Sequence, residues 1–229
     1  MAGIFSDIWR SVMGGPEDGG AGGAEGGGGG CAFNTPVARS VPLEPEEATA
    51  RVEELVPQLV ERRYKLLALD FDQTIISEHT GGMWAGTAEE LARFVRPVMA
   101  ALLRAASAAE ELQLAVVTFS GQIAIVRAVL ASVVGEGAAS RIAIRGADGS
   151  WPVPAGAPQG GKMPHLHSVW ADIMKRTGEE VGGGQTVLVD DDRHNIEVGE
   201  QHGVAAIWFN PAEGAGGDRT LLRQLAILD

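Results

Sequence analysis

Pairs of aspartates follow two of the short apolar runs in the sequence. Asp70 and Asp72 come after the first run, and Asp190 and Asp191 come after a later one. Carboxylates that share a crevice repel one another unless a cation lies between them, and hard oxygen ligands favour Mg²⁺. A carboxylate beside such a cation can attack phosphorus, and a second one can protonate the leaving oxygen and then take a proton from water. The aspartates therefore predict Mg²⁺-assisted phosphoryl chemistry if the fold brings them together.

Two hydroxyl residues and a lysine could complete a cradle for phosphoryl oxygens. Thr118 and Ser120 follow another apolar run, and Lys162 precedes an amphipathic stretch. Hydroxyl and ammonium groups offset the charge that spreads over a phosphoryl group during its transfer. Each piece alone has a plainer interpretation: a helix cap for the hydroxyls, a solvated loop residue for Lys162, and a solvated helix start for the acids at 190–192. Their joint occurrence at the ends of successive runs favours a functional site.

The apolar runs alternate with amphipathic stretches along the chain. Runs that are apolar throughout predict strands of a parallel sheet covered on both faces, and the stretches between them predict the covering helices. The expected strands are 64–69, 112–117, 141–144, 186–189 and 204–209, and the expected helices are 45–62, 87–109, 122–134, 165–176, 195–202 and 218–228. Pro57 is expected to kink or break the first helix, and Pro97 lies inside the second. We expect an α/β fold with a doubly wound (Rossmann-like) five-stranded parallel sheet, in which ligands bind at the carboxyl ends of the strands.

The chain divides into three segments by composition. Residues 1–13 form a short amphipathic segment, residues 14–44 form a Gly-rich flexible linker, and residues 45–229 carry the alternating pattern of the α/β domain. The linker cannot bury enough apolar surface to offset its ordering entropy. Residues 4–13 could dock on a partner or a membrane surface. A short helix is marginal in water, which favours the plainer interpretation of a frayed or weakly packed terminus.

The overall composition limits the classes of protein and partner. The 229 residues include 18 basic and 30 acidic side chains, and the net charge of −12 argues against a nucleic acid as partner, because such binding rests on neutralising phosphates. The single cysteine, Cys31, excludes an intrachain disulfide and a Cys-based zinc site. No apolar run approaches the ~20 residues of a transmembrane segment, and the N-terminus does not resemble a secretory signal. We expect a cytoplasmic protein, with organellar targeting left open.

The candidate residues resemble the motifs of the haloacid dehalogenase (HAD) superfamily of phosphatases. Residues 70–74 (DFDQT) are similar to its D-x-D-x-T first motif, and residues 116–118 (VVT) to its second, a hydrophobic strand that ends in Thr or Ser. Lys162 stands where the lysine of the third motif belongs, and residues 190–191 (DD) are similar to the acid pair of the fourth. This resemblance implies the same α/β fold and an activity on phosphomonoesters.

Two longer segments are similar to one member of that superfamily, the magnesium-dependent phosphatase family. Residues 162–166 (KMPHL) resemble its K-x-x-H-[FL] segment, and residues 190–196 (DDDRHNI) resemble its D-D-x-x-x-N-I segment. Members of this family act on protein phosphotyrosine and on phosphorylated sugar amines. The resemblance therefore implies a phosphoprotein or a small sugar-type phosphate as the substrate.

The resemblance also implies a role for each catalytic candidate. Asp70 would be the nucleophile that forms an aspartyl-phosphate, and Asp72 would be the general acid/base. Thr118 would hold a phosphoryl oxygen, helped by Ser120 or its backbone amide. Lys162 would pair with the phosphoryl group and steady Asp70. Dehalogenases of the superfamily lack a second aspartate at the position of Asp72, so this residue favours phosphorus chemistry over the cleavage of a carbon–halogen bond.

The ligands of Mg²⁺ follow from the same resemblance. Asp70, the backbone carbonyl of Asp72 and the acid pair Asp190–Asp191 would hold the cation, with Asp191 as the direct ligand of that pair and Asp190 as its support. The pair Asp191–Asp192 is an alternative register. We prefer Asp190–Asp191 because it follows the expected strand directly.

Insertions that cap the site decide substrate choice in much of this superfamily, and this chain has room only for a minimal cap. The candidates are a flap at 77–84 and a loop at 147–161. In the flap, His79 and Trp84 could line the substrate pocket, and Trp84 could equally well pack the flap onto the domain. His165 is expected to cap a helix or to lie at the surface.

Two other functions remain open on the sequence alone. The first is a non-catalytic binding or scaffold protein on the same fold, which the intact set of candidate residues argues against. The second is a phosphotransferase that passes the phosphoryl group to an acceptor other than water. The sequence does not separate this transfer from hydrolysis.

Overall fold

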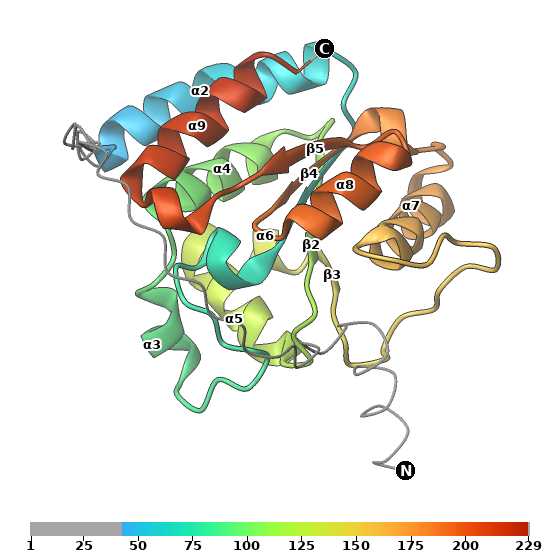
Figure 1. Cartoon of the computed structure of the whole chain (residues 1–229), viewed down its shortest axis with the longest axis horizontal. Helices are drawn as coiled ribbons and strands as arrows, with labels where there is room; N and C mark the ends of the chain where they lie inside the picture. The colour runs from blue at the N-terminus through green and yellow to red at the C-terminus, as the bar shows by residue number, and fades with distance from the viewer. Residues whose placement is uncertain (1–42, 229) are drawn as a thin grey trace, which may run out of the picture. The chain divides into compact units, whose positions relative to one another are not determined.

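The computed structural model describes residues 43–228, which contain a five-stranded sheet (Figure 1). The strand order is β3-β2-β1-β4-β5, and every neighbouring pair is parallel. The strands are β1 (Leu66–Leu69), β2 (Gln113–Val117), β3 (Ala143–Arg145), β4 (Thr186–Asp190) and β5 (Ala205–Trp208). The expected doubly wound α/β fold is thus confirmed. The amphipathic segment 1–13, its docking residues 4–13 and most of the linker 14–44 lie outside the described residues.

Helices separate the strands. The α-helices are α2 (Pro45–Glu61), α3 (Ala88–Ala92), α4 (Pro97–Ala108), α5 (Ile123–Val134), α6 (Glu136–Ala139), α7 (Met163–Thr177), α8 (Arg193–Gln201) and α9 (Ala215–Ala226). Three shorter turns are η1 (Phe71–Ile75), η2 (Gly183–Gln185) and η3 (Pro211–Glu213). None of the described helices has the length and apolar character that crossing a membrane requires.

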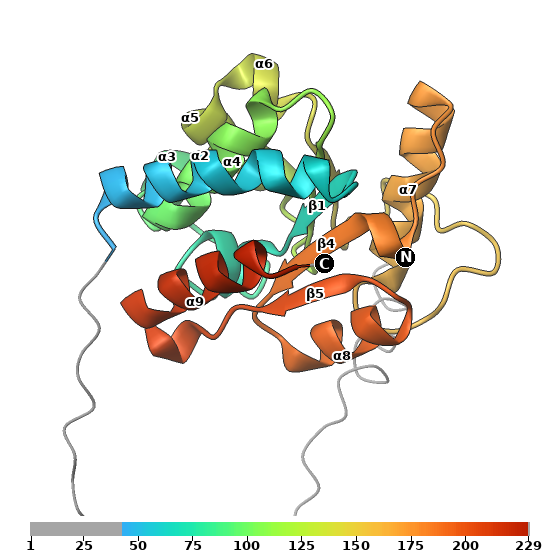
Figure 2. The ribbon, with the colours of Figure 1, turned by 90° about the horizontal axis from the view of Figure 1, so that it is seen from above.

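The sheet is apolar on both faces, which explains why its strands show no polar alternation. In β1, Leu67 and Leu69 belong to a core cluster with residues of α2, α4, α5 and α9. Leu66 and Ala68 belong to a second cluster with residues of α7, on the other face. Figure 2 shows helices on both sides of the sheet. Each fully buried leucine contributes roughly 1.5–3 kcal/mol, so the strand residues do much to stabilise the platform that carries the site.

The helices differ from the sequence prediction at three places. The single helix expected over 87–109 is two helices, α3 and α4, because Pro97 begins the second and Arg96 before it is extended (φ −68°, ψ 135°). Pro57 does not break the first helix, since α2 continues through it to Glu61. The short helix α6 (Glu136–Ala139) was not predicted, because its glycine-containing sequence is typical of a loop.

The expected minimal cap corresponds to two segments without helix or strand. Residues 77–84, the flap, follow η1, and residues 147–161 connect β3 to α7. An antiparallel bridge between Ile76 and Val95 joins the residue before the flap to a residue just after α3, the helix that follows the flap. Within residues 43–228, the carboxyl ends of β1, β2 and β4 are therefore flanked by loops and not by a separate domain.

Candidate functional site

The register of two neighbouring strands places Asp70 beside Asp190. Leu69 pairs with Val189 in the parallel ladder of β1 and β4, and the Asp70 N–H donates to the Val189 carbonyl at 2.9 Å. Asp70 is the first residue after β1, and Asp190 is the last residue of β4. Both carboxyl groups are buried. Buried carboxylates at adjacent strand ends need a cation between them.

Lys162 supplies one such cation. Its Nζ donates to Asp70 Oδ1 at 2.6 Å and lies 3.9 Å from Asp190 Oδ2, and its side chain is only 1% exposed. The residue stands at the start of α7, and Gly161 before it has φ +48°. A Cβ at Gly161 would come within 3.1 Å of Asn195 Oδ1, so glycine lets the chain pass close enough to bring Lys162 to the carboxylates.

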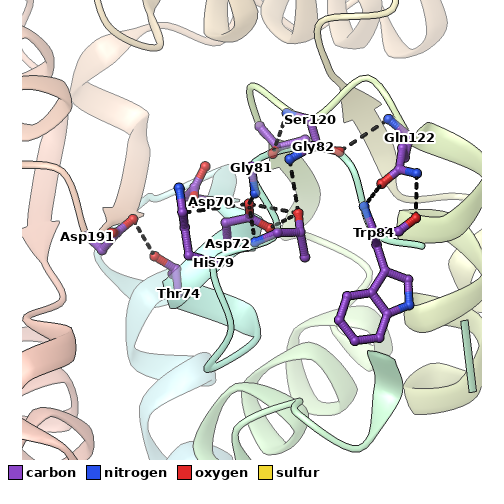
Figure 3. A network of polar contacts seen from close by, with 12 residues as sticks. Asp70, Asp72, Thr74, His79, Gly81, Gly82, Trp84, Ser120, Gln122 and Asp191 are labelled. Atoms are coloured by element: carbon purple, nitrogen blue, oxygen red, sulfur yellow. Dashed lines mark hydrogen bonds and ion pairs between the residues drawn. The ribbon is translucent and has the colours of Figure 1, made fainter. Parts of the chain in front are cut away.

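Three successive aspartates, the last residue of β4 and the two that follow it, have different tasks. Asp190 Oδ1 accepts from the Asp192 N–H and from Asn195 Nδ2, both at 2.9 Å. Asp191 is half-buried, and its Oδ1 accepts from Thr74 Oγ1 at 3.5 Å (Figure 3). Asp192 is exposed and caps α8, since its Oδ1 accepts from the His194 N–H at 2.8 Å. Asp192 is thus used as the N-cap of α8, and Asp190 and Asp191 are the two aspartates that contact residues near Asp70, namely Lys162 and Thr74.

Thr118 and Ser120 form a buried turn after β2. The Thr118 N–H donates to the Arg145 carbonyl at 2.9 Å, which extends the pairing of β2 and β3 past the strand end. Thr118 Oγ1 accepts from the Ser120 N–H, and Ser120 Oγ accepts from the Gln122 N–H at the start of α5. Both hydroxyls thus help to shape the turn before α5, at the same sheet edge as Asp70, and neither caps the helix as the plainer interpretation proposed, because the N-cap residue is Gln122.

The wide turn η1 carries Asp72 to the flap. The Ile76 N–H donates to the Phe71 carbonyl, and Gln73 adopts a positive φ of 57°, so the chain turns sharply after Asp70. The Asp72 carboxylate accepts from the Thr80 N–H and the Gly81 N–H, each at 3.0 Å, and from Thr80 Oγ1 at 2.9 Å (Figure 3). The flap therefore fixes the orientation of this carboxylate.

The two flap residues predicted for the substrate pocket lie differently. His79 is exposed, and its Nδ1 lies 3.9 Å from Asp72 Oδ2. The Trp84 indole points away from Asp70 and Asp72 (Figure 3), packs edge-on against Phe94 and donates to the Thr87 carbonyl. This geometry supports the packing role that the sequence left open for Trp84.

The tip of the flap lies against the turn after β2. Gly82 has φ +73°, and a Cβ there would come within 3.3 Å of Ser120 Cα, so a larger residue would push the flap away from this turn. Two hydrogen bonds between Gln122 and the backbone of Trp84 hold the same contact. The flap that orients Asp72 is thereby tied to the segment that carries Thr118 and Ser120.

Burial and charge shift the acid–base behaviour of the cluster. Burial raises the pKa of Asp70 to about 7, opposed by Lys162 and reinforced by Asp190. Burial also raises the pKa of Asp190 and that of Asp191 to about 6 each. Burial acts to lower the pKa of Lys162, but the carboxylates of Asp70 and Asp190 more than offset it and the pKa is raised. One ammonium is thus too little charge to hold all these carboxyls ionised at neutral pH.

The carboxylate oxygens at the carboxyl ends of β1 and β4 are suitable ligands for a hard divalent cation. Asp190 Oδ2 is buried and has no hydrogen-bond partner among the described residues. Within residues 43–228, no group of three or more His, Cys, Asp or Glu is placed to hold a metal ion by itself. Mg²⁺ does not require such a group, because it takes one or two carboxylates and completes its shell with waters and phosphate oxygens.

His165 and its aromatic neighbours form a part of the site that the sequence analysis missed. The structure buries His165, which was expected at a cap or the surface, between Phe119 at 5.3 Å and Trp151 at 4.8 Å. Burial, with a contribution from Lys162, lowers the pKa of His165 to about 3, so the ring is neutral. Phe119 in turn lies 3.9 Å below Lys162 Nζ. The position of Phe119 between the two candidate residues Thr118 and Ser120 was the sequence signal that could have identified this part of the site.

Comparisons with known proteins give a distant likeness. No protein-family model matches this chain, and no curated protein sequence does. Among solved structures, the HAD domain of the Legionella pneumophila effector protein Lem4, as an inactive mutant, is similar at 15% identity and a TM-score of 0.41, over 67% of this chain and 89% of that one. The structure of that domain not described as a mutant is similar at 13% identity and a TM-score of 0.39, over 64% and 85%. Likeness at this level does not establish family membership.

Proposed function

We propose that this chain is a Mg²⁺-dependent phosphomonoester hydrolase of the HAD superfamily that works through an aspartyl-phosphate. The observation that carries the proposal is the buried ion pair of Asp70 and Lys162 at 2.6 Å, with Asp190 Oδ2 3.9 Å from the same ammonium. Burying these charges costs desolvation energy that their attraction repays poorly, and buried charged groups with shifted pKa values are typical of functional sites. The phosphatase domain would span 45–229, with a minimal cap like that of the magnesium-dependent phosphatase family.

The first half of the reaction transfers the phosphoryl group to Asp70. A carboxylate oxygen of Asp70 attacks phosphorus, and the bond from phosphorus to the leaving oxygen breaks. Asp72, held by the flap at the next turn of the chain, gives its proton to that oxygen. Lys162 and the turn of Thr118 and Ser120 offset the charge on the equatorial oxygens.

The second half returns Asp70 to its starting state. Asp72, now ionised, takes a proton from a water that attacks phosphorus, and the bond between phosphorus and Asp70 breaks to release inorganic phosphate. The carboxylates of Asp70, Asp190 and Asp191 and the backbone carbonyl of Asp72 would hold Mg²⁺. The cation supplies positive charge that keeps the carboxylates ionised and polarises the phosphoryl group. The helix-capping role of Asp192 supports this set over the alternative pair Asp191–Asp192.

The test of this function is phosphate release from p-nitrophenyl phosphate with Mg²⁺ and with EDTA. Release that needs Mg²⁺ and is inhibited by fluoroberyllate, an analogue of the aspartyl-phosphate, supports the proposal. Activity that persists in EDTA contradicts the Mg²⁺ requirement. A folded protein that neither releases phosphate nor binds fluoroberyllate would instead be the scaffold alternative. Product analysis with added alcohols distinguishes hydrolysis from transfer to another acceptor.

Thermal stability should report the cation independently of turnover. The raised pKa values of Asp70, Asp190 and Asp191 mean that the folded metal-free state keeps protons that the unfolded state has released, so its stability falls as pH rises from about 4 to about 7. Mg²⁺ competes with these protons. At ~100 times its Kd we expect it to raise the Tm by roughly 5–10 °C at about pH 8 and much less at about pH 5.

A pair of matched variants checks which aspartate is responsible for that stabilisation. Asp191→Asn should abolish most of the Mg²⁺-induced rise in Tm at about pH 8, because it removes a proposed ligand. Asp192→Asn should keep it, since asparagine is an equally good helix cap. The reverse result, with the loss at Asp192, would shift the metal-binding pair by one residue.

The loss of kcat/KM on changing Thr80 should depend on how strongly the leaving oxygen of the substrate needs a proton. Its hydroxyl and N–H hold the carboxylate of Asp72. We expect Thr80→Val to lower kcat/KM roughly tenfold for an alkyl phosphate, whose leaving oxygen needs the proton, and only about twofold for p-nitrophenyl phosphate. Thr80→Ser should restore both. An equal loss on both substrates would assign Thr80 to the packing of the flap instead.

A further inference from the structure

A cleft that does not include Asp70 lies along β3, the outermost strand of the sheet, and four arginines line it. It has a volume of about 990 Å³ and follows the edge strand β3, which contacts both α5 and α7. Residues of both α6 and α7, two helices that lie apart in Figure 2, line the cleft. Its lining includes Arg127, Arg141, Arg145 and Arg176. The reaction proposed above uses none of these residues.

Backbone and side-chain acceptors hold the guanidinium groups in place. Arg127 donates to the carbonyls of Ala139 and Ile142, and Arg145 Nε donates to Ser168 Oγ at 2.9 Å. Arg141 donates to the Gly137 carbonyl. Each of these contacts leaves further N–H groups of the fork available, because a guanidinium has five donors. Donors fixed in this way lose little entropy when an anionic partner arrives.

The cleft is basic in an acidic protein. Its four arginines face two acidic lining residues, Asp172 and Glu110, whereas the whole chain has a net charge of −12. Asp172 pairs with Arg145 at 3.5 Å and with Arg176 at 3.3 Å, which leaves positive charge in excess. The surroundings repel anions and the cleft attracts them, so charge complementarity selects an acidic partner here.

The edge strand presents side chains and few free carbonyls to a partner. Arg127 donates to the Ile142 carbonyl at 3.3 Å, and Arg145 Nη1 donates to the Ile144 carbonyl at 3.2 Å. A strand added to β3 would have to displace these bonds. An extended peptide recognised through its carboxylates meets the guanidinium groups directly, often two N–H groups at a time.

The cleft also leads toward the candidate site. Arg145 ends β3, and its carbonyl accepts from the Thr118 N–H, so the Arg145 end of the cleft borders the proposed phosphate-binding turn. Arg176, which donates to the side chain of Gln113 at the start of β2, lies toward the other end. We infer that this cleft binds an acidic peptide segment that flanks the phosphorylated residue of a protein substrate. This inference rests on the proposed function and names its substrate class as phosphoproteins with acidic flanks.

Two phosphopeptides of equal length test the inference, one with glutamates on both sides of the phosphorylated residue and one with glutamines. We expect wild type to show a roughly tenfold higher kcat/KM for the acidic peptide. The double variant Arg141→Gln/Arg176→Gln should bring the two peptides to parity, with turnover of p-nitrophenyl phosphate unchanged. Arg219→Gln, which alters an exposed arginine paired with Glu47 on another face, is the matched control and should keep the preference.

A binding measurement separates failure of the cleft from failure of the proposed function. Fluorescence anisotropy with the unphosphorylated acidic peptide should show salt-sensitive binding that the double variant loses and Arg219→Gln keeps. This result supports the cleft even if no substrate is hydrolysed, which would count only against the phosphatase. Equal binding and hydrolysis of both peptides overturns the cleft while p-nitrophenyl phosphate turnover keeps the phosphatase. An RNA oligonucleotide that binds more tightly than the peptide also overturns it.

Discussion

Asp70→Asn should lower kcat for phosphate release by at least about 10⁴-fold, because an amide cannot serve as the nucleophile that becomes phosphorylated. The loss should be chemical and not structural. Asparagine has nearly the same volume, and its Oδ1 can still accept from Lys162 Nζ, which lies 2.6 Å from Asp70 Oδ1. Burial already disfavours the ionised form of Asp70, whose pKa is raised to about 7, and Lys162 keeps Asp190 at 3.9 Å as a partner, so Asp70→Asn leaves no buried charge without an opposite charge. Phosphate release and circular-dichroism melting of the same samples measure both quantities.

The control for this variant is an exposed aspartate away from the site. Asp148 is exposed and accepts from Ser150 in the loop 147–161, so Asp148→Asn should retain activity within about twofold. Activity of Asp70→Asn within tenfold of wild type, with both proteins folded, would remove Asp70 from the nucleophile position. Wild-type enzyme quenched in acid during turnover should also carry phosphate covalently, and the variant should not.

The strand ends were predictable from the sequence because they rest on local patterns. The central strands β1, β2 and β4 are apolar on both faces for most of their length, and the polar residues that end or follow them mark where the sheet ends. Asp70, Thr118 and Asp190 were placed correctly at the edge of the sheet for this reason. That they meet in one cluster follows from the parallel register of β1 with β2 and with β4.

The contacts that orient these residues were not predictable, because they depend on segments distant in the sequence. The hydrogen bonds between Thr80 and Asp72 require the turn η1. In this turn Gln73 has a positive φ, which a glutamine in the sequence does not indicate. The burial of His165 requires Trp151 to fold back from the loop 147–161. Helical periodicity reported an amphipathic α7 correctly but could not show what would cover its first turn.

Lys162→Met should both destabilise the protein and slow the reaction. The ammonium is buried between Asp70 and Asp190, so its removal leaves two buried carboxyl groups without a cation. Breaking one side of a buried ion pair typically costs about 3–5 kcal/mol, although methionine fills the space and gains some apolar burial. We expect an unfolding free energy lower by about 3 kcal/mol near pH 7.5 in the absence of Mg²⁺. Loss of one electrostatic contact to the phosphoryl group should lower kcat by roughly 10²–10³-fold.

The pH dependence of this destabilisation distinguishes charge from packing. Lys162 lowers the pKa of Asp70 and of Asp190, so in the variant both values rise further above those of the unfolded chain. The folded variant then takes up these protons at higher pH than wild type does, so its deficit should shrink as pH falls from alkaline values to the wild-type range of about pH 6 to 7 and should change little below it. Lys65→Met is the matched control, since Lys65 makes a surface ion pair with Glu179 at 3.9 Å and should cost less than about 1 kcal/mol at any pH. A deficit for Lys162→Met that does not change with pH would assign its cost to side-chain packing, and the buried ammonium would then no longer account for the ionisation of Asp70 and Asp190.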